Sequence, residues 1–280
     1  MRKLYRAAME HELRYQLAAL IAAAVLVHVC YETWVRPVAA QQLQWRESGA
    51  GAAPAMGRAA VIVKDYEQEI CLIAMLWALA IMLLKAGTLR YSRRLFAVKG
   101  RGGQANFLET RETDIILPEA KDLDRYREIL DRAKALGYRA TVLYKAAAAS
   151  LDRFFTTSRV PEATLAMQQI CETEAERQET GLSMVRYLIW LIPSVGFIGT
   201  VRGIGAALGK AEQAVQGNIG PVTESLGVAF NSTFVALVIS VVIMLFLHKL
   251  QEAQETLILD TQDFCNDHLL RYMREKIPGA

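Results

Sequence analysis

Among the polar side chains inside two long apolar segments, four are the first candidates for chemistry. Thr200 lies in the first segment, and Asn231, Thr233 and Ser240 lie in the second. A polar group at membrane depth is costly unless it meets a partner or water, so these residues form our candidate ion pathway. Helix packing is the alternative, because hydroxyls also bond to carbonyls of their own or a neighbouring helix. Composition leaves both interpretations open.

Small residues surround Thr200 at helical spacing. Glycines four positions apart let two membrane helices approach closely, so the sequence predicts helix packing here. The pattern does not fit a phosphate-binding loop, because only three residues separate Gly205 from Gly209 and Ala211 follows Lys210. The predicted packing residues are Gly196, Gly199, Gly203, Gly205 and Gly209.

Arg202 is the charged residue closest to Thr200. Residues two apart project from nearly opposite faces of a helix, so we expect Arg202 to face away from Thr200. Glu224, at the mouth of the second apolar segment, is a candidate ion-pair partner. No Asp or Glu lies in the middle of any apolar run. Proton transfer through a membrane normally uses an ionisable group at depth, so a proton pathway here would need one from another chain.

Enzyme chemistry has little support in the sequence. The cysteines and histidines show no metal-ligand spacing, and we find no nucleophile–base pair or cofactor loop. We therefore predict no enzyme activity, no metal and no cofactor. The net charge of +3 also argues against a nucleic-acid partner.

The apolar residues, which make up 53% of the chain, gather in a few runs. Four runs reach or approach the roughly 20 residues that a membrane-spanning helix needs. They cover residues 15–34, 70–84, 187–201 and 225–247. The predicted fold class is an all-α integral membrane protein with four transmembrane helices.

Charge distribution gives the expected orientation. Basic residues precede the first run and follow the second. Because basic loops stay on the cytoplasmic side, this pattern predicts that both termini are cytoplasmic. It also places residues 37–65 and 213–222 outside and residues 101–186 in the cytoplasm.

Helical patterns continue beyond the membrane. Residues 118–136 and 139–155 have the apolar spacing of two amphipathic helices, which we expect to form a small cytoplasmic domain. From Pro161 the chain predicts one long helix that enters the membrane near Leu182.

The last apolar run also continues without a helix breaker. Leu250, Leu257 and Phe264 recur every seven residues, which suits packing against neighbouring helices. The last two transmembrane helices are thus expected to be long and to extend into the cytoplasm.

The chain divides into four predicted regions. Residues 1–100 contain two peripheral transmembrane helices, at about 15–35 and 66–86, and a periplasmic loop. A cytoplasmic helical domain over 101–180, pore helices over 181–249 and a cytoplasmic C-terminal helix over 250–280 follow.

Two strings resemble the MotA/TolQ/ExbB proton-channel family. PSVGFIGTVRGI, residues 193–204, is similar to a signature in which a proline precedes Gly-x-x-Gly-Thr-Val-x-Gly-Ile. LGVAFNSTFVALVIS, residues 226–240, is similar to the family's last helix. Both occur in order within residues 181–262. Two departures are Val228, where ExbB and TolQ types carry a glutamate, and Arg202, which replaces a commonly apolar residue.

The resemblance implies a homopentamer around a central pore in the bacterial inner membrane. It implies a dimeric one-span partner of the ExbD, TolR or MotB type, whose aspartate carries the ion opposite a ring of Thr200 and Thr233. The implied function is the pore-forming subunit of an ion-driven motor or stator that couples proton-motive force to mechanical work. H+ is the implied ion, and hydroxyls also suit Na+. The alternative is a non-conducting membrane scaffold. The process powered stays open among outer-membrane transport, envelope maintenance, motility and phage defence.

Overall fold

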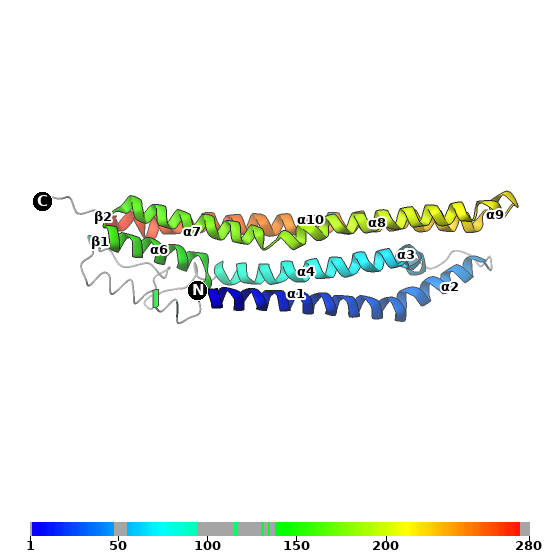
Figure 1. Ribbon diagram of the computed structural model, residues 1–280, viewed down its shortest axis with the longest axis horizontal. Coiled ribbons are helices and arrows are strands. Elements are labelled where there is room, and N and C mark those ends of the chain that lie inside the picture. The colour runs from blue at the N-terminus through cyan, green and yellow to red at the C-terminus, as the bar shows by residue number, and fades with distance from the viewer. Residues whose placement is uncertain are drawn as a thin grey trace. The chain divides into compact units, whose positions relative to one another are not determined.

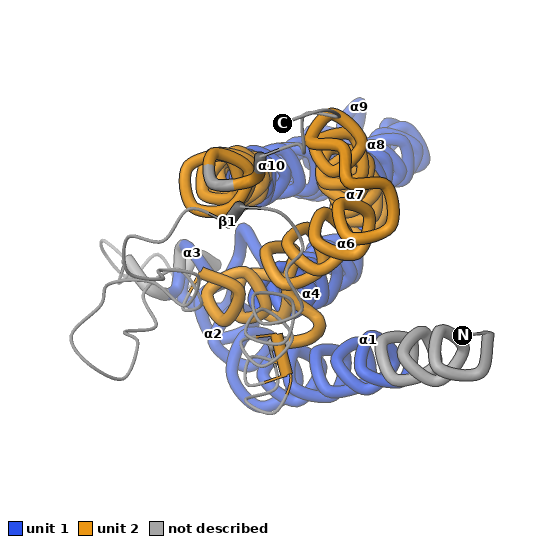
Figure 2. Tube along the Cα trace, turned by 90° about the vertical axis from the view of Figure 1, so that its left-hand side faces the viewer, with its two compact units in different colours: residues 1–83, 183–248 blue, residues 84–182, 249–280 orange. Residues whose placement is uncertain are grey.

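The computed structural model describes residues 2–47, 55–93, 115–116, 130–131, 134 and 138–274. This part of the chain is helical apart from a short parallel pair between β1 (Ile115–Ile116) and β2 (Met273–Arg274). The predicted all-helical class is therefore confirmed. The chain forms two compact units (Figure 2): unit 1 contains residues 1–83 and 183–248, and unit 2 contains residues 84–182 and 249–280.

The N-terminal helices of unit 1 begin with α1 (Arg2–Cys30), which continues through the π-helix η1 (Tyr31–Val35) into α2 (Arg36–Glu47). After α3 (Ala55–Val63), α4 runs over Tyr66–Arg93. The indole of Trp77 donates to the Gln16 carbonyl at 2.9 Å and joins α4 to α1. Residues 37–65, predicted to be a periplasmic loop, contain most of α2 and all of α3 in their described part, because alanine and glutamine are good helix formers.

The C-terminal helices of unit 1 are α8 (Ser183–Gly209), the short α9 (Ala211–Val215) and the first part of α10 (Gly220–His268). Figure 1 shows α8 and this part of α10 running side by side. Cys71 of α4 approaches α8, with its sulfur 3.6 Å from the Ile192 carbonyl oxygen. Helix α8 thus contacts both α10, which follows it closely in sequence, and the distant α4.

The predicted long helix from Pro161 is interrupted. Helix α7 covers Val160–Thr180, and a turn at Gly181 and Leu182 separates it from α8. There the Leu182 amide donates to the Glu179 carbonyl at 3.1 Å, a three-residue step that replaces the four-residue step of an α-helix. Glycine has a low helix propensity, which accounts for the position of the interruption.

Unit 2 is built on α6 (Val142–Thr157) and α7, which pack together, and on the end of α10. The side chain of Thr141 caps α6 by accepting from the Tyr144 amide at 3.4 Å. Helix α6 therefore matches the helix predicted over 139–155. The helix predicted over 118–136 lies outside the described residues except for 130–131 and 134.

The predicted heptad on α10 is only partly buried. Leu250 and Leu257 are 7% and 2% exposed, but Cys265 is buried in place of its neighbour Phe264. An α-helix advances 3.6 residues per turn, so a straight helix drifts away from a seven-residue stripe.

Four helical stretches are long and apolar enough to cross a membrane: Arg14–Trp45, Tyr66–Arg93, Val160–Gly209 and Gly220–His268. Only 17–28% of their most apolar windows is buried inside the chain. Large apolar side chains such as Trp190, Phe197 and Val241 are 64–77% exposed. Apolar surface of this extent suits contact with lipid or with further subunits.

Candidate functional site

The hydroxyls of Thr200 and Thr233 meet between α8 and α10. They are hydrogen-bonded to each other, and both residues are half-buried. Thr200 Oγ1 also lies 3.1 Å from the Ala229 carbonyl oxygen, and Thr233 Oγ1 lies 3.1 Å from that of Gly196. Each hydroxyl carries one proton. While one hydroxyl donates to the other, only the second can donate to a carbonyl, either that of Ala229 on α10 or that of Gly196 on α8. The arrangement is a short hydrogen-bonded chain with two proton positions.

Ser240 forms a hydrogen bond to a third backbone carbonyl between the same two helices. Pro193 lies inside α8 and has no N–H, so the Ile189 carbonyl lacks its usual helical donor. The Ser240 hydroxyl donates to this oxygen at 3.0 Å. A side chain of α10 thus satisfies the group that the proline leaves unpaired, as neighbouring helices do in membranes.

Asn231 is not part of this group. It lines a groove of about 790 Å³ in unit 1 together with Glu224, Val228 and Lys64. Of the four candidate polar residues, the structure therefore brings together Thr200 and Thr233, places Ser240 two turns away on the same interface, and puts Asn231 on another face.

The predicted packing glycines separate into two groups. A Cβ at Gly196 would lie 2.5 Å from the Ala236 Cβ, and one at Gly203 would lie 2.7 Å from the Ala229 backbone nitrogen. Gly199 is equally close to Ser232, at 2.6 Å. Added Cβ atoms at the two other glycines of the stripe, Gly205 and Gly209, would meet no atom within 4 Å.

Three glycines thus let α8 approach α10 of the same chain. The small residues that receive them on α10 are Ala229, Ser232 and Ala236. Sequence reasoning missed these three, although their spacing of three and four positions is the signal that could have identified them.

Arg202 pairs with Glu67 of α4 and not with the expected Glu224. Its Nε and Nη2 atoms each lie 2.7 Å from a different carboxylate oxygen of Glu67, a two-point contact. The Glu67 side chain is 10% exposed, whereas that of Arg202 is 52% exposed. The Glu67 Cγ lies 3.1 Å from the position of a Cβ on Gly199, so the acid rests against α8 beside Thr200. The two partners are 135 residues apart, and no local pattern signals the pair.

A second carboxylate network lies at the start of α4. Glu69 accepts from Arg36 at 2.8 Å and contacts His28 Nδ1 at 2.7 Å. The Arg36 guanidinium also lies over the Tyr66 ring, 4.5 Å from its centroid. These contacts join α1 and α2, on either side of the π-helix η1, to α4, and sequence reasoning did not identify them.

Comparison with known proteins gives one match. Residues 139–263 match the model of the MotA/TolQ/ExbB proton channel family. No curated protein and no solved structure matches the chain. The matched range contains α6 to α8 and most of α10, and so includes both threonines and Arg202. Proteins of this family work as oligomeric membrane complexes with a partner protein. The resemblance of the two strings to the MotA/TolQ/ExbB proton channel family is therefore confirmed over residues 139–263, a little under half of the chain.

Proposed function

We propose that the chain is the pore-forming subunit of a proton-driven motor in the bacterial inner membrane. The observation that carries the proposal is the Thr200–Thr233 pair between the two helices of the family motif. Five copies would surround a pore, with both termini in the cytoplasm. The exposed apolar surface of α8 and α10 supports such an assembly, because it needs lipid or neighbouring subunits to cover it.

The titrating acid is proposed to come from a second protein. Helix α8 contains no Asp or Glu, and α10 contains none between Glu224 and Glu252. A partner with a single span, of the ExbD, TolR or MotB kind, would supply an aspartate opposite the threonines. Proton passage through this carboxylate would drive movement between the partner and the pore.

The threonine pair can respond to a carboxylate that alternates between charged and neutral. A charged carboxylate needs donors, so a hydroxyl would turn its proton toward it. A neutral carboxyl donates its own proton, which a hydroxyl can accept. The two proton positions of the Thr200–Thr233 pair allow either response without moving a helix.

A non-conducting scaffold is the second candidate. It is favoured by one observation: the hydroxyls of Thr200, Thr233 and Ser240 already have backbone carbonyl partners within the chain. In that case Thr200 and Thr233 would act only in packing α8 against α10.

Proton flux separates the two candidates. The complex with its one-span partner would be placed in liposomes, and proton entry measured with a pH-sensitive dye under an imposed potential. We expect Thr200→Val or Thr233→Val to lower the flux about fivefold to tenfold while the oligomer stays intact, because valine keeps the shape and removes the hydroxyl.

The matched control is Ser194→Ala. Ser194 is on α8 as well, but its hydroxyl bonds only to Trp190 of the same helix, at 3.0 Å. If both threonine variants conduct as Ser194→Ala does, the scaffold is the better account. Replacing the proton gradient by a sodium gradient in the same liposomes tests the ion.

A further inference from the structure

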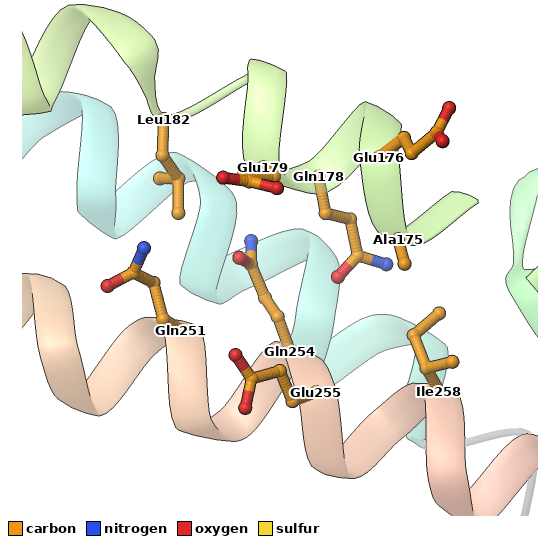
Figure 3. Close-up of a pocket in the computed structure, with 9 residues that line it drawn as sticks. All are labelled: Ala175, Glu176, Gln178, Glu179, Leu182, Gln251, Gln254, Glu255 and Ile258. Atoms are coloured by element: carbon orange, nitrogen blue, oxygen red, sulfur yellow. The ribbon is translucent and has the colours of Figure 1, made fainter. Parts of the chain in front are cut away.

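A second candidate binding site lies in unit 2, away from the threonines. A pocket of about 310 Å³ opens between α7 and the part of α10 beyond His248. Its volume is at the small end of the range for small-molecule sites and far above the roughly 30 Å³ that one water occupies. Figure 3 shows the side chains that line it.

Two side-chain amides in this pocket have no hydrogen-bond partner within the described part of the chain. Gln178 of α7 and Gln254 of α10 extend toward each other (Figure 3). Gln254 is only 8% exposed, and the Oε1 atom of Gln178 is buried without a donor. Buried polar atoms in proteins nearly always have partners, so the Gln178 Oε1 atom indicates a missing donor.

The charge of the lining defines what the partner should be. Three carboxylates, those of Glu176, Glu179 and Glu255, line the pocket, and no basic side chain does. The pocket therefore favours a cation that donates N–H groups to amide and carboxylate oxygens.

A bare metal ion does not fit this lining. Within the described residues, no group of three His, Cys, Asp or Glu side chains could hold a metal ion. Leu182 and Ile258, which are 0% and 8% exposed, add an apolar surface to the pocket. Such a surface suits methylene groups, which a metal ion lacks and an alkylamine has.

We propose that this pocket, defined by Gln178, Gln254 and Glu255, binds a small organic cation of the alkylamine class. An ammonium group would donate to the Oε1 atoms of Gln178 and Gln254 and to the Glu255 carboxylate, and its methylenes would lie against Leu182 and Ile258. The bound ligand would connect α7 to α10 within unit 2. The proposal is independent of the proposed proton-channel mechanism.

Spermidine is a suitable probe, titrated into the intact detergent-solubilised complex by calorimetry. We expect saturable binding, one molecule per chain, that weakens as salt is raised. Gln254→Leu should weaken binding about tenfold or more, because a buried hydrogen bond to a charged group is lost. Glu255→Gln should weaken it by a smaller factor, and Gln254→Glu should tighten it by adding a negative charge at the same place.

The control is Glu172→Gln, which removes another exposed acid of α7 that does not line the pocket. Its affinity for spermidine should equal that of the unchanged complex. The proposal is overturned if no saturable binding occurs up to about 1 mM. It is also overturned if all variants bind equally, since that would be attraction to surface acids in general.

Discussion

Helix α10 presents polar side chains to a neighbouring helix in both units, and the two interfaces treat them differently. In unit 1, Thr233 and Ser240 each donate to a carbonyl of α8. In unit 2, Gln254 faces α7 without a partner in the described chain. A membrane offers no water to replace a missing bond, whereas a pocket open to water can be completed by solvent or a ligand. The comparison suggests packing and ion transfer for the first interface and ligand binding for the second.

The largest effect is expected at the closest approach of α8 to α10. Gly203→Ala places a methyl group 2.7 Å from a backbone nitrogen of α10, which cannot move aside as a side-chain end could. We expect a loss of about 2–3 kcal/mol in unfolding free energy, measured by thermal unfolding in detergent.

Gly205→Ala is the matched control for that change. Its added methyl meets no atom within 4 Å, and alanine is the better helix former. It should leave stability unchanged or raise it by up to about 1 kcal/mol. Equal losses at both positions would contradict the described packing of α8 on α10.

Breaking the ion pair between Glu67 of α4 and Arg202 of α8 should cause the next largest loss of stability. Arg202→Met leaves the mostly buried Glu67 carboxylate without its partner. Because Arg202 is half-exposed, we expect the unfolding free energy to fall by about 1–2 kcal/mol, which is less than the cost of breaking a fully buried ion pair. The same unfolding measurement applies.

A charge exchange makes this prediction specific. Glu67→Arg combined with Arg202→Glu should recover part of the stability that each single change loses. Glu224→Gln, which removes the partner predicted from the sequence, should have little effect. A loss at Glu224 equal to that at Glu67 would contradict the observed pairing.

A smaller effect is expected where Ser240 satisfies the Ile189 carbonyl. Ser240→Ala should cost about 1 kcal/mol, because that oxygen then has no donor. Pro193→Ala supplies a backbone N–H to the same carbonyl, so the serine should matter less in that background. A double-mutant cycle measured by unfolding tests this, and strictly additive effects would show that the two residues are not linked.

The smallest effect on stability is expected for a substitution in the unit 2 pocket. Unlike the changes above, it should not lower stability. Without ligand, Gln254→Leu should leave stability unchanged or raise it slightly, since it replaces an unpartnered buried amide by an apolar group. Thermal unfolding with and without spermidine checks this. A clear loss without ligand would mean that Gln254 has a structural partner, and the contrast between the two interfaces would fail.

Local pattern was enough to predict the helical class, the four apolar spans and the family. The apolar runs and the glycine–threonine string around Thr200 carry this information directly. The interruption at Gly181 was missed, because a single glycine is a weak signal within a long helical pattern. The helices α2 and α3 were not predicted, because residues 37–65 were interpreted only as the connection between two spans.

Contacts between distant segments could not be predicted. Nothing near Arg202 in the sequence indicates Glu67, and the choice between two acids depends on which helix packs against α8. The bond from Ser240 to Ile189 likewise requires the register of α8 against α10. Asn231 looked equivalent to Thr233 in sequence but lies on another face of α10, where it lines a separate groove.

We propose that this chain forms the proton pathway and that its one-span partner supplies the titrating acid. The most direct test compares proton flux through liposomes that contain the chain alone, the chain with its one-span partner, and the chain with a partner whose aspartate is changed to asparagine. We expect proton flux only in the second case. Comparable flux through the chain alone, or through the complex with the asparagine partner, would contradict it.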